Sequence, residues 1–231
     1  FLNATSPAYA CSTEWTPAAT AAPAPGATPR LGYVQDDQGI GHVTLGTFVR
    51  YAACPPASGK HYNAPGEGPL PQGFYGADEE TTPQGWIHNL EHSGIVVLYR
   101  CREGDTACDD SGQQALKDFN STFPNSPICN LPAAQTVLVT RFDQMAWPYA
   151  ALLWDQVLPL DTFDAQQIRD FFAQQGERSG PELPCPKPTP TPPPTAPTAP
   201  PTAAPAPAPA PTPTPTAPSD TSAPSPTPAA S

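Results

Sequence analysis

The four histidines of the chain are the residues whose type and spacing best suit metal binding. They are His42, His61, His88 and His92, and the rest of the sequence contains none. Neutral imidazole is the commonest metal ligand in proteins. Residues i and i+4, such as His88 and His92, share a face of a helix and also a face of a strand. We therefore predict that imidazoles from three separate stretches of the chain meet at one ion. The alternative is four unrelated histidines.

The segment HNLEH, from His88 to His92, also matches a short zinc-peptidase motif. In enzymes with H-x-x-E-H the motif lies on a helix, both histidines bind zinc and the glutamate activates water. Here Gly85 precedes the motif and Gly94 follows it, which leaves room for only about two helical turns. A zinc hydrolase is therefore the weaker hypothesis.

Glu91 lies between the two histidines of this motif, and several roles are open to it. It can bind the metal, accept a hydrogen bond that fixes the tautomer of a ligand histidine, act as a general base, or be an ordinary surface acid. If the segment is a strand, Glu91 points away from His88 and His92. This geometry favours a supporting role behind the ligands, which is the role we assign.

The only methionine, Met145, bears on the identity of the metal. A thioether suits Cu(I), whereas imidazole suits copper and zinc alike. A site that combines the histidines with Met145 would favour copper. The alternative for a lone methionine is to fill a gap in the core. We predict copper as the cofactor with zinc as the alternative, and we assign no catalytic residue.

The composition divides the chain into one domain between two proline-rich segments. Residues 186–231 are almost wholly Pro, Ala, Thr and Ser, and residues 1–29 contain a shorter stretch of the same kind. Such segments carry too few bulky apolar side chains to form a core. We predict a linker over 1–29, a globular metal-binding domain over 30–185, and an extended polyproline-II-like tail over 186–231 that acts as a stalk or an assembly segment.

Charge and hydropathy exclude two classes of partner. The net charge is −11 and no basic patch is present, which argues against nucleic acid and anionic membranes. No apolar run approaches the ~18 residues of a membrane span. The acidic clusters at 78–80 and 109–110 lack the calcium-loop pattern and are expected to be surface acids.

The six cysteines indicate disulfide bonds in an oxidising compartment. Their number is even and no C-x-x-C pair is present, so a zinc ribbon or a thioredoxin-like redox site is not expected. Six cysteines allow 15 pairings. We expect Cys101 to pair with Cys108 and Cys11 with Cys185. The full set is Cys11, Cys54, Cys101, Cys108, Cys129 and Cys185.

Other features of the chain fit the same compartment. Asn3 and Asn120 begin glycosylation sequons, which are compatible with a secreted glycoprotein. We expect an extracellular, cell-surface protein from which a leader or an N-terminal anchor has been removed ahead of Phe1.

Apolar patterning between the linkers predicts an α+β fold with a small, mainly antiparallel sheet, two helices and long irregular loops. In the later helix, Asp164 is expected as the N-cap, Phe163 and Ile168 as a hydrophobic staple, and Gly176 as the terminator. The proline- and glycine-rich stretch from 54 to 85 is expected to be loop. Strands are expected at 95–100, 136–141 and 150–153, with one or two over 42–51, and helices at 111–119 and 165–175.

Several ordered segments together resemble a bacterial family catalogued as a domain of unknown function. They are H-V at His42, P-P-A-S-G-K-H ending at His61, H-N-L-E-H-S-G beginning at His88, the segment from Met145 to Trp154, and the G-P-E that ends at Glu182. The chain departs from the family pattern with serine at 93 and aspartate at 155, where glycine is usual. The resemblance implies a secreted or membrane-anchored protein and supplies no reaction.

Three functional hypotheses remain open, and we favour the first. It is a binding or structural module in which metal holds the 54–85 loop against the 88–92 segment. In this hypothesis the tail contacts other copies of the chain, as in an extracellular filament, or other cell-surface proteins. The second hypothesis is a metalloenzyme, either a copper oxidoreductase or a zinc hydrolase, and the third is a spacer whose histidines bind nothing. Four protein ligands would indicate structure or storage, and an open position would indicate catalysis.

Overall fold

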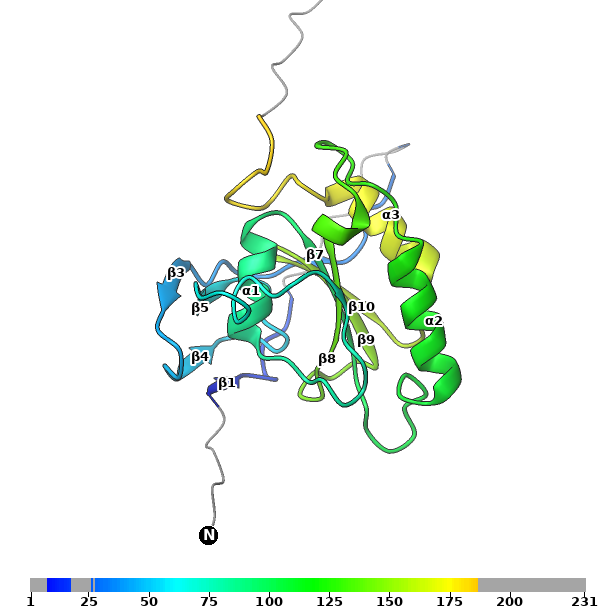
Figure 1. Ribbon diagram of the computed structural model, residues 1–231, viewed down its shortest axis with the longest axis horizontal. Helices are drawn as coiled ribbons and strands as arrows, with labels where there is room; N and C mark the ends of the chain where they lie inside the picture. Colours follow the sequence, from blue (N-terminus) through cyan, green and yellow to red (C-terminus); the bar gives the residue numbers. More distant parts are fainter. Residues whose placement is uncertain (1–7, 18–25, 27, 187–231) are drawn as a thin grey trace, which may run out of the picture. The chain divides into compact units, whose positions relative to one another are not determined.

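A six-stranded mixed sheet forms the centre of the protein in the computed structural model, which describes residues 8–17, 26 and 28–186. The strand order is β2-β10-β9-β7-β8-β6, and Figure 1 labels β10, β9, β7 and β8 of this sheet. The pairs from β2 to β7 are antiparallel, and β8 is parallel to both β7 and β6. The strands are β2 (Tyr33–Val34), β6 (Gly73–Phe74), β7 (Ile95–Tyr99), β8 (Val137–Arg141), β9 (Tyr149–Leu153) and β10 (Gln156–Leu160).

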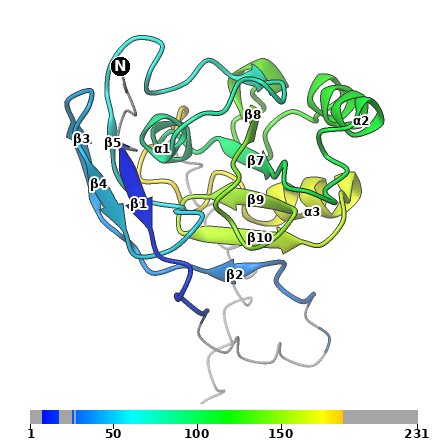
Figure 2. The ribbon, with the colours of Figure 1, turned by 90° about the horizontal axis from the view of Figure 1, so that it is seen from below.

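Three α-helices cover the two faces of this sheet, so the predicted α+β class is confirmed. The helix α1 (Pro83–Glu91) lies on one face, and α2 (Asp110–Ser121) and α3 (Ala165–Gln175) lie on the other (Figure 2). A short 3-10 helix, Ala133–Gln135, precedes β8. Two helices were expected at the positions of α2 and α3, and α1 is a third.

The central strand β7 explains how one sheet serves two cores. Val96 and Leu98 join the cluster beneath α1, whereas Ile95, Val97 and Tyr99 join the cluster beneath α2 and α3. All five residues of β7 are fully buried, as expected for a strand whose faces are both covered. Burying every side chain of a five-residue strand fixes its register and the position of α1 above it.

Two small parallel sheets extend the α1 face of the protein. One joins β1 (Tyr9–Cys11) to β4 (Val49–Tyr51), and the other joins β3 (Ile40–Val43) to β5 (Gly59–Tyr62). Figure 2 shows these four strands on the same side of the molecule as α1. Three residues of the segment expected as a linker, those of β1, are thus paired with a strand of the domain.

The strand β5 also corrects the prediction of continuous loop from 54 to 85. Residues 54–58, which contain two prolines, are irregular as expected. Gly59–Tyr62 nevertheless forms a strand, because residues 40–43 present a free strand edge with which it pairs. The strand β10 was not expected either. It forms a hairpin with β9 through Asp155, a non-glycine residue at φ 56°.

The helix ends follow the expected local chemistry in α3. The Asp164 carboxylate accepts a 2.9 Å hydrogen bond from the Gln167 backbone N–H, which confirms the predicted N-cap. Gly176 ends the helix, as predicted. In α1 the first position is Pro83, which has no N–H to leave unsatisfied, and this suits the start of a helix.

Three disulfides cross-link the domain, and all six cysteines are paired. The predicted Cys101–Cys108 bond is present. The predicted Cys11–Cys185 bond is wrong, because Cys11 pairs with Cys54 and Cys129 with Cys185. The β1–β4 pairing brings Cys11 beside the segment that leads to Cys54, which is a local contact that spacing alone did not reveal.

Some predictions concern residues outside the described part of the chain. The tail over 186–231, apart from its first residue, and the sequon at Asn3 belong to this group. At the second sequon the Asn120 amide nitrogen is buried, and glycosylation at either sequon stays a prediction. Within the described residues, no helix is long and apolar enough to cross a membrane.

Candidate metal centre

The pairing of β3 with β5 brings the first two histidines together. In this parallel pair His42 lies directly opposite His61, although 18 residues separate them in the chain. Side chains at paired positions point to the same face of a sheet. The two imidazole rings are accordingly 5.0 Å apart between centroids. A two-stranded sheet thus supplies half of a candidate ligand set.

The helix α1 supplies the other half. His88 and Glu91 are three residues apart, so they share one face of the helix. This face is turned to β5, where the His88 ring lies 4.9 Å from the His61 ring and 5.1 Å from the His42 ring. The segment is helical because Pro83 can start a helix and because Trp86, Ile87 and Leu90 bury their side chains against the sheet.

The four side chains converge on one point. Glu91 Oε2 lies 3.0 Å from His61 Nε2, and 3.6 Å from the Nε2 atoms of both His42 and His88. One ligand atom from each residue lies within 4.8 Å of every other. Ligand atoms bound tetrahedrally to one ion at about 2.0–2.2 Å would lie roughly 3.3–3.6 Å apart, so shifts of up to about an ångström would bring all four atoms around an ion.

Hydrogen bonds to the backbone fix the tautomers of two of the rings. His61 Nδ1 donates to the Gly59 carbonyl at 2.8 Å, and His88 Nδ1 donates to the Tyr62 carbonyl at 2.6 Å. A carbonyl only accepts, so the proton lies on Nδ1 and each neutral ring presents a lone pair at Nε2. This arrangement is usual for metal-binding histidines, because the second nitrogen holds the ring in place.

The resulting electrostatics favour a cation at this point. The lone pairs of His61 and His88 face a carboxylate oxygen, and Glu91 is itself almost completely buried. A buried anion surrounded by acceptors is costly unless a positive charge joins it. One proton on His61 would satisfy a single contact, whereas a metal ion among the four atoms would satisfy all of them.

Burial keeps His88 available as a ligand at neutral pH. Desolvation lowers the pKa of His88 below its ordinary value, and the nearby His61 and His92 lower it further, while the hydrogen bond to the Tyr62 carbonyl opposes the shift. A neutral imidazole needs to lose no proton before it binds a metal. The ring is therefore in its metal-binding form.

Two contacts hold α1 in the position that the site requires. The Asn89 side chain accepts a hydrogen bond from the Leu70 N–H at 3.0 Å and donates to the Leu70 carbonyl at 2.8 Å. The Glu182 N–H donates to the Glu91 carbonyl at 3.1 Å, and the Ser93 hydroxyl donates to the Glu182 carbonyl at 2.7 Å. Asn89 is itself buried, and nothing in the sequence pattern marks it as a residue that positions α1.

The structure turns His92 toward a different partner. Its ring stacks on His88 at 4.9 Å, but its Nδ1 contacts Glu182 Oε2 at 3.1 Å. His92 therefore lies beside the four-residue cluster and is not among the residues grouped there. It follows the last residue of α1, at the helix C-cap, where the chain begins to turn away from the site.

Met145 lies in the apolar core. It is fully buried in the cluster that includes Trp86, Leu90 and Phe142. This position is typical of a methionine that fills a gap in the core. The predicted role as a thioether ligand is not tested by this position, and the core position makes it the less favoured alternative.

Glu91 is placed differently from the supporting position expected for it. That expectation assumed a strand, in which Glu91 would point away from His88. In the helix the two residues share a face, and Glu91 Oε2 is the atom nearest to the three imidazoles. The carboxylate is therefore a candidate direct ligand, which gives a set of three imidazoles and one carboxylate.

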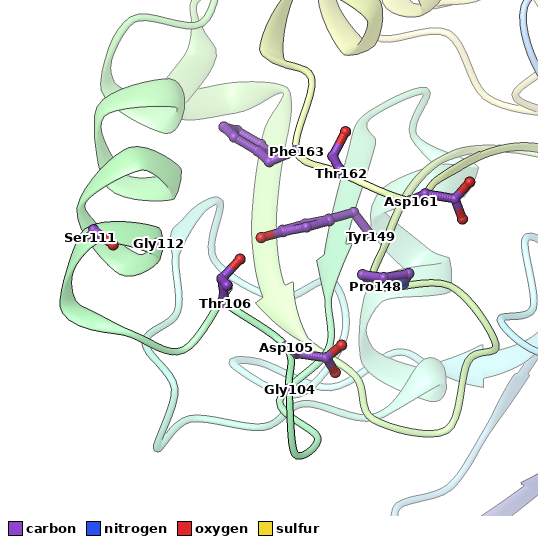
Figure 3. Close-up of a pocket in the computed structure, with 10 residues that line it drawn as sticks. All are labelled: Gly104, Asp105, Thr106, Ser111, Gly112, Pro148, Tyr149, Asp161, Thr162 and Phe163. Atoms are coloured by element: carbon purple, nitrogen blue, oxygen red, sulfur yellow. The ribbon is translucent and has the colours of Figure 1, made fainter.

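A separate cavity of about 290 Å³ lies near the start of α2, between that helix, the start of β9 and the segment that follows β10 (Figure 3). Tyr149, Asp161 and Phe163 are among its lining residues, and none of the four clustered residues is. Its other acid, Asp105, already makes a two-point ion pair with Arg100. This cavity is therefore not part of the candidate metal centre.

A comparison with models of protein families identifies the family of the chain. A family described as "Protein of unknown function (DUF3105)" matches residues 42–187. The chain belongs to the DUF3105 family. The match begins at His42 and includes all four clustered residues, so the resemblance to a family of unknown function is confirmed, although the match does not test the individual motifs. No curated protein and no solved structure matches the chain.

Ser93 and Asp155, the two positions at which the sequence resemblance led us to expect glycine, share one conformation. Ser93 has φ 64° and Asp155 has φ 56°, which places both residues in the left-handed region that favours glycine. The serine gains a hydrogen bond to the Glu182 carbonyl in return. This backbone geometry would suit glycine at both positions, and neither residue belongs to the four-residue cluster.

Proposed function

We propose that this protein is a metal-binding module of the cell surface or extracellular space, and that His42, His61, His88 and Glu91 are the ligands. The observation that carries the proposal is the convergence of three Nε2 atoms on Glu91 Oε2, with the opposite nitrogens of His61 and His88 held by backbone carbonyls. The ion would join β3, β5 and α1, of which β3 and β5 already pair as strands and α1 packs against β5.

The ligand set favours binding over catalysis. Four protein ligands close a tetrahedral shell, whereas catalytic zinc sites usually have three protein ligands and a water. In a zinc hydrolase of the H-x-x-E-H type Glu91 would have to remain free as a base and His92 would have to bind the metal. Here Glu91 is inside the cluster and His92 contacts Glu182, so the hydrolase alternative has no support in the geometry.

Copper remains the metal that we propose, with zinc as the alternative. Imidazole and carboxylate donors bind both ions, and Cu²⁺ forms the more stable complexes in the usual order of divalent metals. This argument does not need Met145. A copper oxidoreductase would additionally require a position for a second reactant beside the ion.

The proposed compartment rests on the cysteines. Three disulfides are typical of proteins that fold in an oxidising environment such as the extracellular space. We further propose that the segment after Cys185 serves as a stalk or contacts neighbouring chains in a filament or another surface assembly. Deleting residues 187–231 and measuring the oligomer size in solution tests this part. An unchanged size would remove the segment from that role.

Metal analysis of the full chain, purified without a histidine tag, tests the central proposal. We expect one Cu²⁺ or Zn²⁺ per chain, and nitrogen hyperfine structure from imidazoles in the electron paramagnetic resonance spectrum of the Cu²⁺ form. His61→Ala and His92→Ala form a matched pair. The first should abolish stoichiometric binding and the second should preserve it. Equal losses in both variants, or no binding by the parent chain, would contradict the proposal.

A further inference from the structure

The four proposed ligands differ sharply in their access to water. The side chains of His61, His88 and Glu91 are 0%, 5% and 4% exposed, whereas the His42 side chain is 47% exposed. A ligand atom can be displaced only if a competing donor reaches the ion. Within the described part of the chain, the burial pattern leaves the side of His42 as the one from which a second molecule can approach.

The ligands also differ in how firmly they are held. His61 and His88 each donate from Nδ1 to a backbone carbonyl, and Glu91 is on a helix whose end is tied to Glu182. The His42 Nδ1 instead lies 3.4 Å from the side-chain amide of Asn63, which is itself exposed. Its imidazole can therefore rotate away from the ion at a lower cost than the other two rings.

The backbone under His42 is comparatively uncovered. Among the described strands β3 pairs only with β5. Ile40, two residues earlier on the same face of β3, is 57% exposed. At the neighbouring Gly39 and Gly41, no atom lies within 4 Å of the place where a Cβ would be. The strand thus has room to shift outward while β5 and α1 stay packed.

From this asymmetry we propose that the ion is exchangeable, and that it enters and leaves past His42 by ligand substitution. A nitrogen or sulfur donor of a second metal-carrying molecule binds the ion, and the bond from the ion to His42 Nε2 breaks. One coordination bond forms and one breaks, no electron is transferred, and the ion keeps its charge. His61, His88 and Glu91 hold the ion until the incoming molecule supplies further donors.

This inference rests on the proposed function and deepens it. A purely structural ion would be enclosed on every side, and its release would wait for local unfolding. An ion held by three buried ligands and one exposed ligand can instead be passed to another molecule by direct contact. The module would then take up or deliver metal at the cell surface.

Stopped-flow measurement of zinc release from the loaded full chain tests the inference. The probe is 4-(2-pyridylazo)resorcinol, a chromophoric chelator, mixed in excess at several concentrations. We expect the release rate to rise in proportion to chelator concentration, because the chelator takes part in the slow step. His42→Ala should still bind one zinc ion, more weakly, and should release it roughly 10-fold faster or more.

Two variants complete the design. His92→Ala removes an imidazole of similar exposure from outside the ligand set and should leave the release rate unchanged. His61→Ala removes a fully buried ligand and should lose stoichiometric binding. Circular dichroism of each variant checks the fold, and His42 and His92 are both exposed enough for their alanine variants to keep it.

Different failures point to different conclusions. If the parent chain takes up no zinc or copper at all, the proposed function fails and this inference fails with it. If the parent chain binds tightly but releases zinc at a rate independent of chelator concentration, only the exchange route is overturned. The same conclusion follows if His42→Ala releases no faster than the parent chain, or if it loses binding as completely as His61→Ala.

Discussion

Replacement of Asp155 by asparagine should stabilise the protein, and by more at neutral pH than at acid pH. Asp155 forms the turn between β9 and β10, and its Oδ1 atom is buried without a hydrogen-bond partner. Burial raises the pKa of this carboxyl to about 6, a shift that nearby Asp37 increases and that hydrogen bonding from Ser58 and Trp154 partly offsets. The ionised form is therefore disfavoured in the folded state.

The size of the effect follows from the pKa difference. The ordinary value is 3.8 and the folded value is about 6, so the folded state binds the proton more tightly than the unfolded state. Stability from this group is greatest below pH 3.8 and falls as the pH rises to about 6. At about 1.36 kcal/mol per pKa unit, the cost of ionisation approaches ~3 kcal/mol at pH 7.5 and ~1 kcal/mol at pH 4.5. Both figures are upper bounds, because water reaches part of the side chain.

An asparagine side chain at this position would keep the shape of the aspartate and tolerate the left-handed backbone without carrying a charge. We expect Asp155→Asn to raise the free energy of unfolding at pH 7.5, and the gain to shrink by up to ~2 kcal/mol at pH 4.5. Urea unfolding of both proteins at both pH values measures the difference. Asp161→Asn, which neutralises an exposed acid just after β10, is the matched control for loss of one charge.

The pH dependence of the difference is the decisive quantity. A gain in stability that is the same at pH 4.5 and pH 7.5 would show that ionisation of Asp155 costs nothing in the folded state. A loss of stability at pH 7.5 would show that the carboxylate makes a favourable contact that asparagine cannot replace. Either result would refute the argument from burial.

Further expectations concern the metal, the core and a helix end. Zinc or copper at 100 times its dissociation constant should raise the free energy of unfolding by about 2.7 kcal/mol. For a domain of this size the gain corresponds to a rise in Tm of roughly 5–11 °C. A chelator should reverse the rise, and an unchanged Tm in calorimetry would count against binding to the folded state. Met145→Leu should leave copper affinity unchanged in competition titrations, and it should lower the free energy of unfolding by less than about 1.5 kcal/mol. A large loss of Cu⁺ affinity would instead make Met145 a ligand. Leu98→Ala, at the centre of the sheet, should cost about 2–5 kcal/mol in urea unfolding. Asp164→Ala should cost about 1 kcal/mol by removing the N-cap of α3, and no change would mean that the cap contributes little.

Local patterns were sufficient to predict the elements whose burial is simple. The strands β7, β8 and β9 are nearly continuous apolar runs because helices cover both faces of the sheet, and α3 has a cap, an apolar stripe and a terminator. By contrast, β5 contains glycine, lysine and histidine in a segment that follows two prolines. It forms a strand because β3 is available beside it, and this tertiary contact leaves no local pattern.

Only part of the candidate site could be predicted, because the rest also depends on contacts that leave no local pattern in the sequence. The clustering of histidine in the sequence was enough to identify the residue type and three of the four clustered positions. The choice between Glu91 and His92 depended on whether residues 88–92 form a helix, because only a helix places Glu91 on the face of His88. The partner that turns His92 away, Glu182, is distant in sequence and could not be inferred from spacing.

The positions of the disulfides determine how a pulling force would travel through the protein. Tension applied at the two ends of the domain would reach the Cys11–Cys54 bond from one side and the Cys129–Cys185 bond from the other. Each bond transmits the force directly from one cysteine to the other, so the chain segment that it encloses is not stretched. The stretch between Cys54 and Cys129 would therefore bear the mechanical load. This stretch contains the short loop closed by Cys101–Cys108 and also His61, His88 and Glu91, and an ion shared among these three residues would add a further cross-link. Single-molecule stretching should then record a higher rupture force for the metal-loaded chain than for the metal-free chain.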